Sequence, residues 1–499
     1  MGRFFLLLLL PVFIACSTLK TPVPQPKEEF RGVWVATVAN IDWPEHPADP
    51  WGKKQADFLK ILNFYSKLQF NAVFVQVRTA GDALYATRLA PWSRYLTGKE
   101  GDPGDLVTDP LKWMIDETHK RGMEFHAWFN PYRATFDMKT ELLDTTHDFY
   151  KFPEWMVKYG KKYYYNPGLP EVREHLVNIV REVVARYPVD GVHFDDYFYP
   201  YRIQGEVFED SIAYENYAIE DQSLEDWRRS NISMLVRDTH AAIKELKPWV
   251  QFGISPFGVW RNASQDPRGS DTRAGQTNFD DLFADPLEWS RNGWVDYLAP
   301  QLYWSLDYAP AAHRKLLSWW SGAVPETPLL IGSGAYKIGN NPDEAWSNKT
   351  ELPEQLILGR KTSNIKGNIF FSARSLMRKN TDVVRILRNQ IYNKPVFPPP
   401  LEQTVESSLK RPGIVLKETR DYLYFTLTDT ELRYQFVEIR SPGVTGTGKK
   451  KRYRGKKIYL GELSSFRVPA RDLRGMKNLE LVFTDKFRQK TKPLKINRK

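Results

Sequence analysis

The stretch PEVREHLVNIVREVVARYPVDGVHFDDYFYP, residues 170–200, joins a helical pattern to a strand pattern through a short link. Over residues 170–187 apolar side chains recur every three to four positions, which is the spacing of one helix face. Residues 191–198 then form an apolar run of strand length. A helix that leads into a buried strand through four residues is typical of folds built from parallel strands and covering helices.

The same unit recurs along the chain, and eight strand patterns can be counted. They are FRGVWVATV (30–38), NAVFVQVR (71–78), EFHAWFNPY (124–132), GVHFDDYF (191–198), QFGISPFG (251–258), YLAPQLYW (297–304), PLLIGSGAY (328–336) and GNIFFSAR (367–374). Eight such units predict an α/β fold, a (β/α)8 barrel of the TIM type over residues 30–394. A doubly wound open sheet is the alternative, but no Gly-rich phosphate turn follows the first strand.

The connections between these units are unequal in length. Links from helix to strand are short, whereas four links from strand to helix are long and rich in Trp, Tyr, Arg and Asn, namely 39–51, 133–168, 199–223 and 259–279. In a (β/α)8 barrel the strand-to-helix loops lie together on the carboxyl-terminal face. We therefore expect one elaborated, functional rim there.

A proline-rich segment follows the eighth helical pattern. Residues 395–403 read as a semi-rigid linker. Beyond it, residues 404–499 hold short alternating segments separated by turn residues, which predicts a small all-β sandwich of the fibronectin III or immunoglobulin type.

The positive charge of the chain is concentrated in this last part. Residues 401–499 hold 24 of the 71 Lys and Arg residues but only 11 of the 60 Asp and Glu residues, so the rest of the chain is nearly neutral. The densest basic run is GKKKRYRGKK, residues 448–457. Such a loop could bind an anionic envelope polymer or a membrane surface, and a solvated loop without a ligand is an equally good interpretation. A nucleic-acid partner is not expected for an exported protein.

Export is predicted by the first sixteen residues, MGRFFLLLLLPVFIAC. A basic start and an apolar run shorter than a membrane span are typical of a signal peptide. Residues 13–16 resemble a bacterial lipobox, which implies lipid attachment to Cys16 and hence a membrane partner in the cell envelope, in the periplasm or at the outer membrane. Cys16 is the only cysteine, so no disulfide is expected. Residues 17–29 read as a polar tether.

Two adjacent acids, Asp195 and Asp196, end the fourth strand pattern. Paired carboxylates serve acid/base catalysis, because burial and a neighbouring charge keep one protonated while the other stays ionised. Glycosidic cleavage needs that combination. The alternative is a structural ion pair with a nearby arginine, which the strand-end position makes less favoured.

Other chemistries find less support in the sequence. There is no HExxH motif, no Walker loop, no cysteine ligand set and no histidine pair at helical spacing. No metal and no cofactor are therefore expected.

Five motifs together resemble the bacterial glycosyl hydrolase-like 10 barrels, which include envelope lipoproteins that digest denuded peptidoglycan strands. They are FRGVWVATVANIDWP (30–44), AWFNPYR (127–133), GVHFDDYFYP (191–200), ISPFGVWRN (254–262) and LAPQLYWS (298–305). The resemblance covers residues 29–395 and implies a glycoside hydrolase whose catalytic candidates are Asp195 and Asp196.

Two mechanisms stay open at this point, because the seventh strand pattern ends in GSGAY without a carboxylate. In the favoured one, the acetamide of an N-acetylated sugar attacks the anomeric carbon while the Asp pair orients it and protonates the leaving oxygen. In the other, one aspartate works with a loop acid such as Asp307 or Asp82. A non-catalytic glycan-binding lipoprotein and a glucan hydrolase of nutrient uptake are the rival functions. The side chains expected to contact the glycan are Trp34, Arg78, Trp128, Asn130, Arg133, Tyr197, Tyr199, Trp260, Gln301, Tyr303 and Trp304.

Overall fold

The computed structural model describes residues 23, 25–377, 381–400, 409–428, 434–441, 455–461 and 463–498. The predicted signal peptide, the lipidation site at Cys16 and most of the basic run 448–457 lie outside the described residues. Among the residues described, no helix has the length and apolar character needed to cross a membrane.

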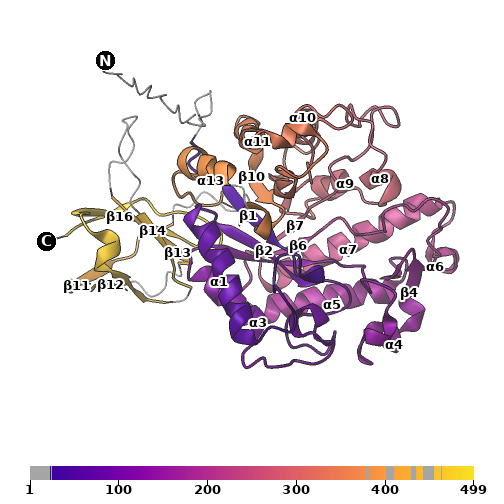
Figure 1. The fold of residues 1–499 in the computed structure, drawn as a ribbon, viewed down its shortest axis with the longest axis horizontal. Helices are drawn as coiled ribbons and strands as arrows, with labels where there is room; N and C mark the ends of the chain where they lie inside the picture. Colours follow the sequence, from indigo (N-terminus) through magenta and orange to yellow (C-terminus); the bar gives the residue numbers. More distant parts are fainter. Residues whose placement is uncertain are drawn as a thin grey trace, which may run out of the picture.

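Eight parallel strands close into a barrel in which neighbours along the chain are neighbours in space (Figure 1). The strands are β1 (Phe30–Val35), β2 (Ala72–Arg78), β3 (Glu124–Phe129), β6 (Gly191–Phe194), β7 (Gln251–Ile254), β8 (Tyr297–Leu298), β9 (Leu329–Ser333) and β10 (Ile365–Phe370). The last strand pairs with the first, Phe30 opposite Gly367, so the sheet has no free edge. The prediction of a TIM-type barrel is confirmed.

One principal helix follows each barrel strand. These helices are α1 (Trp51–Lys67), α3 (Pro110–His119), α5 (Pro170–Arg186), α7 (Leu224–Leu246), α9 (Pro286–Arg291), α10 (His313–Ala323), α11 (Glu351–Arg360) and α13 (Thr381–Ile386). In α5 a proline occupies the first turn, and Val172, Leu176, Ile179 and Val183 are buried on one face. That apolar face packs in the layer between the helices and the barrel.

Shorter elements decorate the loops at the carboxyl ends of the strands. They are the helices α2 (Arg94–Thr97), α4 (Asp148–Lys151), α6 (Ser211–Tyr217), α8 (Asn278–Asp281) and α12 (Ala373–Met377), and the hairpin strands β4 (Met156–Tyr159) and β5 (Lys162–Tyr165). The hairpin lies in the long loop between β3 and α5.

Aromatic side chains fill the interior of the barrel. Phe74 stacks on His126 with ring centroids 4.5 Å apart. His193 stacks on Tyr297, and the Nε1 of Trp34 donates a hydrogen bond to the Nε2 of His193 (3.2 Å). These contacts form a packed layer directly below the carboxyl ends of the strands, so the barrel is a filled core and not a channel.

Two antiparallel sheets follow the barrel. One has the order β11 (Ile414–Glu418), β12 (Tyr422–Leu427), β15 (Ser465–Pro469), and the other has β14 (Gly455–Tyr459), β13 (Phe436–Arg440), β16 (Asn478–Thr484), β17 (Leu494–Asn497). Side chains of both sheets, including Phe425 and Phe483, share one apolar core. The C-terminal all-β region is thus confirmed at the level of its sheets, while its relation to immunoglobulin-type domains stays a prediction.

These sheets lie against the amino-terminal ends of the barrel strands, whereas α4, β4 and α6 lie on the opposite side of the molecule (Figure 1). Arg488 donates to Glu124 at the start of β3 (Nε to Oε1, 2.8 Å) and also contacts Gln251 at the start of β7. The Nε2 of Gln435 donates to Asp190 (2.6 Å). The carboxyl-terminal end of the barrel is therefore left uncovered by the two sheets.

Candidate active site

A pocket of about 200 Å³ opens at the carboxyl ends of the barrel strands. Its lining comes from strand ends and from the loops that follow them. The lining residues are Trp34, Ala36, Val38, Ile41, Gln76, Trp128, Asn130, Arg133, Asp195, Asp196, Tyr197, Tyr201, Ser255, Gln301, Tyr303, Tyr336 and Phe371. From the sequence we expected a functional rim at this end of the barrel. A pocket in which several polar groups converge is the usual form of a binding site.

Asp195 and Asp196 stand at the point where the chain leaves the barrel ladder after Phe194. Both are buried, with 4% and 2% of their surface exposed. The backbone N–H of Tyr197 donates to the Oδ1 of Asp195 (3.3 Å), while its Oδ2 accepts no hydrogen bond. Asp196, in contrast, accepts a hydrogen bond from the phenol of Tyr201. The two neighbours therefore sit in different environments.

This difference is reflected in their proton affinities. Burial, and then the charge of Asp196, raise the pKa of Asp195 to about 8. Burial also raises the pKa of Asp196, but the hydrogen bond from Tyr201 opposes that rise. Both carboxyl groups are therefore harder to ionise than a free aspartate, and only Asp196 has a phenol that stabilises its carboxylate form.

Arg133 supplies a positive charge beside this pair. Its guanidinium lies over the ring of Tyr197, 4.2 Å from the centroid, and its charge lowers the pKa of both aspartates. Burial, and then the charge of Asp196, raise the pKa of Tyr197 to about 12, so this phenol stays neutral. Together these groups keep the net charge of the pocket low.

Aromatic rings form another part of the pocket lining. Tyr303 lies 5.8 Å from Tyr336 and 6.2 Å from Phe371, and Trp34 lies 6.3 Å from Phe371 (centroid to centroid). Tyr336 is 41% exposed, so this group continues from the buried floor to the surface. Ring faces of this kind are suited to stacking on the apolar faces of sugars.

The structure brings together most of the residues that the sequence singled out. Nine of the thirteen catalytic and substrate-contact candidates line the pocket, namely Trp34, Trp128, Asn130, Arg133, Asp195, Asp196, Tyr197, Gln301 and Tyr303. The other four, Arg78, Tyr199, Trp260 and Trp304, lie outside the lining.

Each of these four has other partners. Arg78 donates to the phenol of Tyr165 (3.0 Å), and the Tyr199 phenol donates to Asp210 (3.0 Å). Trp304 packs edge-on against Phe257 (5.6 Å). Arg78 ends β2 as predicted, but Tyr199, Trp260 and Trp304 lie beyond the ends of β6, β7 and β8, in connections whose path the strand pattern does not predict.

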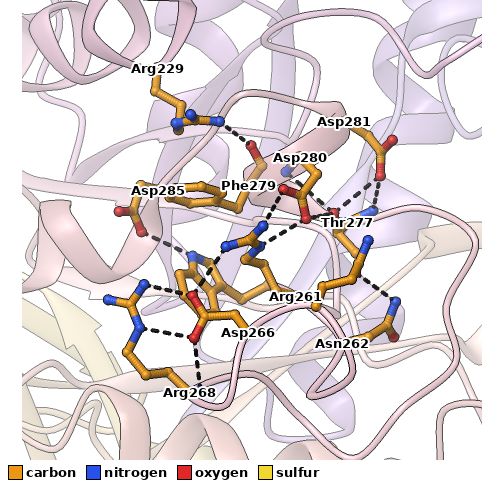
Figure 2. Close-up of polar contacts among 12 residues, drawn as sticks. Arg229, Arg261, Asn262, Asp266, Arg268, Thr277, Phe279, Asp280, Asp281 and Asp285 are labelled. Atoms are coloured by element: carbon orange, nitrogen blue, oxygen red, sulfur yellow. Dashed lines mark hydrogen bonds and ion pairs between the residues drawn. The ribbon is translucent and has the colours of Figure 1, made fainter. Parts of the chain in front are cut away.

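Trp260 belongs to a polar network in the loop between β7 and α9 (Figure 2). Its Nε1 donates to Asp285 (3.0 Å). Next to it, Arg261 forms a two-pronged ion pair with Asp280 (2.9 and 2.8 Å) and contacts Asp266 (3.1 Å). Asp281 of the same loop pairs with Arg202, the residue after Tyr201. The network therefore braces the loop that carries the phenol bound to Asp196.

Sequence reasoning missed several lining residues. Gln76 lies inside a strand, where the sequence pattern does not single out an isolated amide. Tyr201 and Phe371 lie in loops, and Tyr336 lies in a short 3-10 helix after β9; the sequence does not reveal the path of these segments. The tyrosine spacing in the run 197–201 was the one available signal, because alternate residues there are phenols.

The loop acids of the second mechanism lie elsewhere. Asp307 is exposed and pairs with Arg314 (2.6 Å). Asp82 accepts hydrogen bonds from the N–H groups of Thr79 and Ala80 (2.8 and 2.9 Å). Within the described part of the chain, Asp195 and Asp196 are the only carboxylates that line the pocket, and no group of three or more His, Cys, Asp or Glu is arranged to hold a metal.

Comparison with known proteins gives a consistent result. The family model described as glycosyl hydrolase-like 10 matches residues 29–348. The glycosyl hydrolase YngK of Bacillus subtilis (strain 168) is 43% identical over 425 residues, which are 84% of this chain and 82% of the relative. The glycosyl hydrolase DigH of Escherichia coli (strain K12) is 39% identical over 383 residues, 72% of this chain and 86% of the relative.

Among solved structures, the glycoside hydrolase domain of PgaB (BpsB) from Bordetella bronchiseptica matches with a TM-score of 0.48 and 12% identity, over 72% of this chain and 99% of that domain. The family resemblance expected from the five motifs is confirmed by the family model and by the two relatives. The chain belongs to the glycosyl hydrolase-like 10 family.

Proposed function

We propose that this protein is a glycoside hydrolase that cleaves strands of N-acetylated sugars, with Asp195 and Asp196 as its catalytic residues. The observation that carries the proposal is the pair of buried carboxyl groups with unequal hydrogen bonding in a pocket that has room for about one sugar residue. Membership of a glycosyl hydrolase-like family, and relatives named as glycosyl hydrolases, support the reaction class.

In this proposal Asp195 is the general acid. Its raised pKa keeps it protonated near neutral pH, so it can give its proton to the oxygen of the leaving sugar. Asp196, held as a carboxylate by Tyr201, accepts the N–H of the substrate acetamide and turns the acetamide oxygen toward the anomeric carbon. No third carboxylate among the described residues lines the pocket to act as a nucleophile.

The two chemical steps then balance. The acetamide oxygen bonds to the anomeric carbon as the glycosidic bond breaks, and Asp195 protonates the departing oxygen. Water next attacks the anomeric carbon, the Asp195 carboxylate takes the proton from that water, and the acetamide is released. Arg133 offsets the negative charge that Asp195 carries between the steps.

We propose peptide-free peptidoglycan strands as the substrate, because their sugars carry the acetamide that this scheme requires. The signal-peptide and lipobox patterns that end at Cys16 support a lipid-anchored protein of the bacterial cell envelope. The basic run 448–457 would then face anionic envelope polymers.

The test uses defined glycan strands with and without stem peptides, and the same strands after deacetylation. Mass spectrometry of the products is expected to show cleavage of the peptide-free acetylated strands, at least about tenfold faster than of the deacetylated strands. Equal cleavage of deacetylated strands would overturn the acetamide mechanism. Retention of strands without any turnover would instead favour a glycan-binding protein.

A further inference from the structure

The side chain of Gln76 is fixed by the backbone of the loop after β1. Gln76 lies in β2 and is fully buried. Its Oε1 accepts hydrogen bonds from the N–H groups of Thr37 (3.1 Å) and Val38 (3.0 Å). Because a backbone N–H can only donate, the oxygen of this amide must face the loop. The Nε2 of Gln76 must therefore face the other way.

That nitrogen fixes a second amide. The Nε2 of Gln76 donates to the Oδ1 of Asn130 (3.1 Å), just beyond the end of β3. A donor can only meet an acceptor, so the oxygen of Asn130 is turned toward Gln76. The Nδ2 of Asn130, also buried, is the free end of this chain of amides and donates to no acceptor among the described residues.

A second donor without an acceptor lines the same pocket. It is the Nε of Arg133, on a residue that is 4% exposed, whereas the indole of Trp128 is directed at the carboxyl group of Asp195 and lowers its pKa. A buried donor without an acceptor costs free energy, and such groups are uncommon in folded proteins. Two of them beside one pocket indicate a ligand that brings acceptor oxygens.

We propose that Gln76 is a positioning residue and that Asn130 and Arg133 form a donor pair for the acceptor oxygens of the sugar bound at Asp195. This inference rests on the proposed function and adds which side chains of the binding site donate hydrogen bonds to the substrate. If the Asn130 amide turned by half a rotation, its Oδ1 would face the acceptor oxygen of the substrate, and that contact would be repulsive. Gln76 prevents that rotation because both polar atoms of its own amide are already bonded to the protein.

The decisive variant is Gln76→Glu. Its carboxylate still accepts from Thr37 and Val38, but it can no longer donate to Asn130, so the Asn130 amide is expected to rotate. We expect kcat/KM on acetylated glycan strands to fall about tenfold to hundredfold, and Asn130→Ala to cause a similar loss. The matched control is Gln251→Glu, the same change in a buried strand residue at the opposite end of the barrel, for which no loss is expected.

A double-mutant cycle separates positioning from a merely structural role. If Gln76 acts through Asn130, the double variant loses no more activity than either single variant. In addition, protonation of the introduced carboxylate at low pH restores the donor, so the activity of Gln76→Glu relative to the wild type should recover as the pH is lowered. Asn130→Ala should show no such recovery.

The outcomes are distinguishable. Suppose that the wild type cleaves strands. Additive losses in the cycle, or full activity of either single variant, would then overturn this inference and leave the proposed function intact. A wild type that neither binds nor cleaves acetylated strands would overturn both. Unfolding midpoints of all variants close to that of the wild type would show that the losses do not come from failed folding.

Discussion

The two ends of the barrel differ in how their buried carboxyl groups are bonded. At the amino-terminal end, the Glu124 carboxylate is paired with Arg488, and Asp190 accepts from His119, the N–H of Phe125 and Gln435. At the carboxyl-terminal end, the Oδ2 of Asp195 and the Nδ2 of Asn130 have no hydrogen-bond partner among the described residues. The first arrangement stabilises the fold, and the second leaves polar atoms that can form hydrogen bonds with a substrate.

Removal of the Asp195 carboxyl group, at the carboxyl-terminal (open) end of the barrel, should have the largest effect on activity. Asp195→Asn is expected to lower kcat on glycan strands by about a hundredfold to ten thousandfold, because an amide cannot supply the proton. The measurement is product release from peptide-free strands, and a loss below about tenfold would contradict the assignment.

The same variant should also be the more stable protein toward neutral pH. The folded pKa of Asp195, about 8, is above that of the unfolded chain, so the wild type loses unfolding free energy as the pH rises from about 4 to about 8. Asp195→Asn lacks this loss, and denaturant unfolding at the two ends of that range measures the difference.

Removal of Arg488, the cation at the amino-terminal (closed) end of the barrel, should lower stability and leave activity unchanged. Although burial opposes it, Arg488 and His126 lower the pKa of Glu124 to about 2, so Glu124 is charged at neutral pH. Arg488→Met leaves that charge buried and partly unpaired, with an expected loss of about 3–5 kcal/mol in unfolding free energy. The kcat/KM of the folded fraction should not change; a loss of activity without a loss of stability would mean that the two ends are not independent.

Tyr201 offers a smaller change at the open end. Tyr201→Phe removes the hydrogen bond that opposes the rise in the pKa of Asp196. The acidic limb of the kcat/KM profile, where Asp196 must be ionised, should therefore move to higher pH, with a loss of about tenfold at neutral pH.

Tyr199→Phe is the matched control, because Tyr199 loses the same hydroxyl but bonds Asp210 outside the pocket. Its pH profile should coincide with that of the wild type. Identical shifts in both variants would show that the change is general and not specific to Asp196.

The smallest effect is expected from Lys457 at the closed end. Its ammonium lies between the rings of Phe397 and Phe436 (4.6 and 4.2 Å), and burial lowers its pKa to about 8. The unfolded chain binds a proton that the folded chain releases above this pH, so stability rises with pH there. Relative to Lys457→Met, the wild type should gain about 1 kcal/mol of unfolding free energy for one pH unit above this pKa. A constant difference would contradict the lowered pKa.

Much of the fold could be predicted from the sequence, because a buried parallel strand is a nearly continuous apolar run. All eight strands begin within two residues of the predicted positions, but several end early: β6 stops at Phe194 and β8 at Leu298. The reason is that the chain leaves the ladder where it must present polar side chains, as at Asp195. In the C-terminal region the sequence predicts only short alternating segments, because strands such as β11, β15 and β17 are short and mostly exposed or half-exposed.

The site was predictable where side chains are carried by strand ends and unpredictable where they are carried by loops. Asn130, Asp195 and Gln301 were found because neighbouring parallel strands end at one rim. Tyr336 and Phe371 depend on how the loops fold back, and Gln76 acts through a partner 54 positions away. Such pairings between distant residues leave no periodic signal in a single sequence.

The contact between Arg488 and Glu124 also concerns the order of synthesis. The two residues are 364 positions apart, so Arg488 is made long after Glu124. At usual elongation rates the interval is roughly 20–70 s. During that time the guanidinium of Arg488 is not available to Glu124, so the barrel has to wait for the sheets that follow it. A product truncated before Arg488 would keep the charge of Glu124 buried without this partner. It would therefore be less stable and more readily degraded.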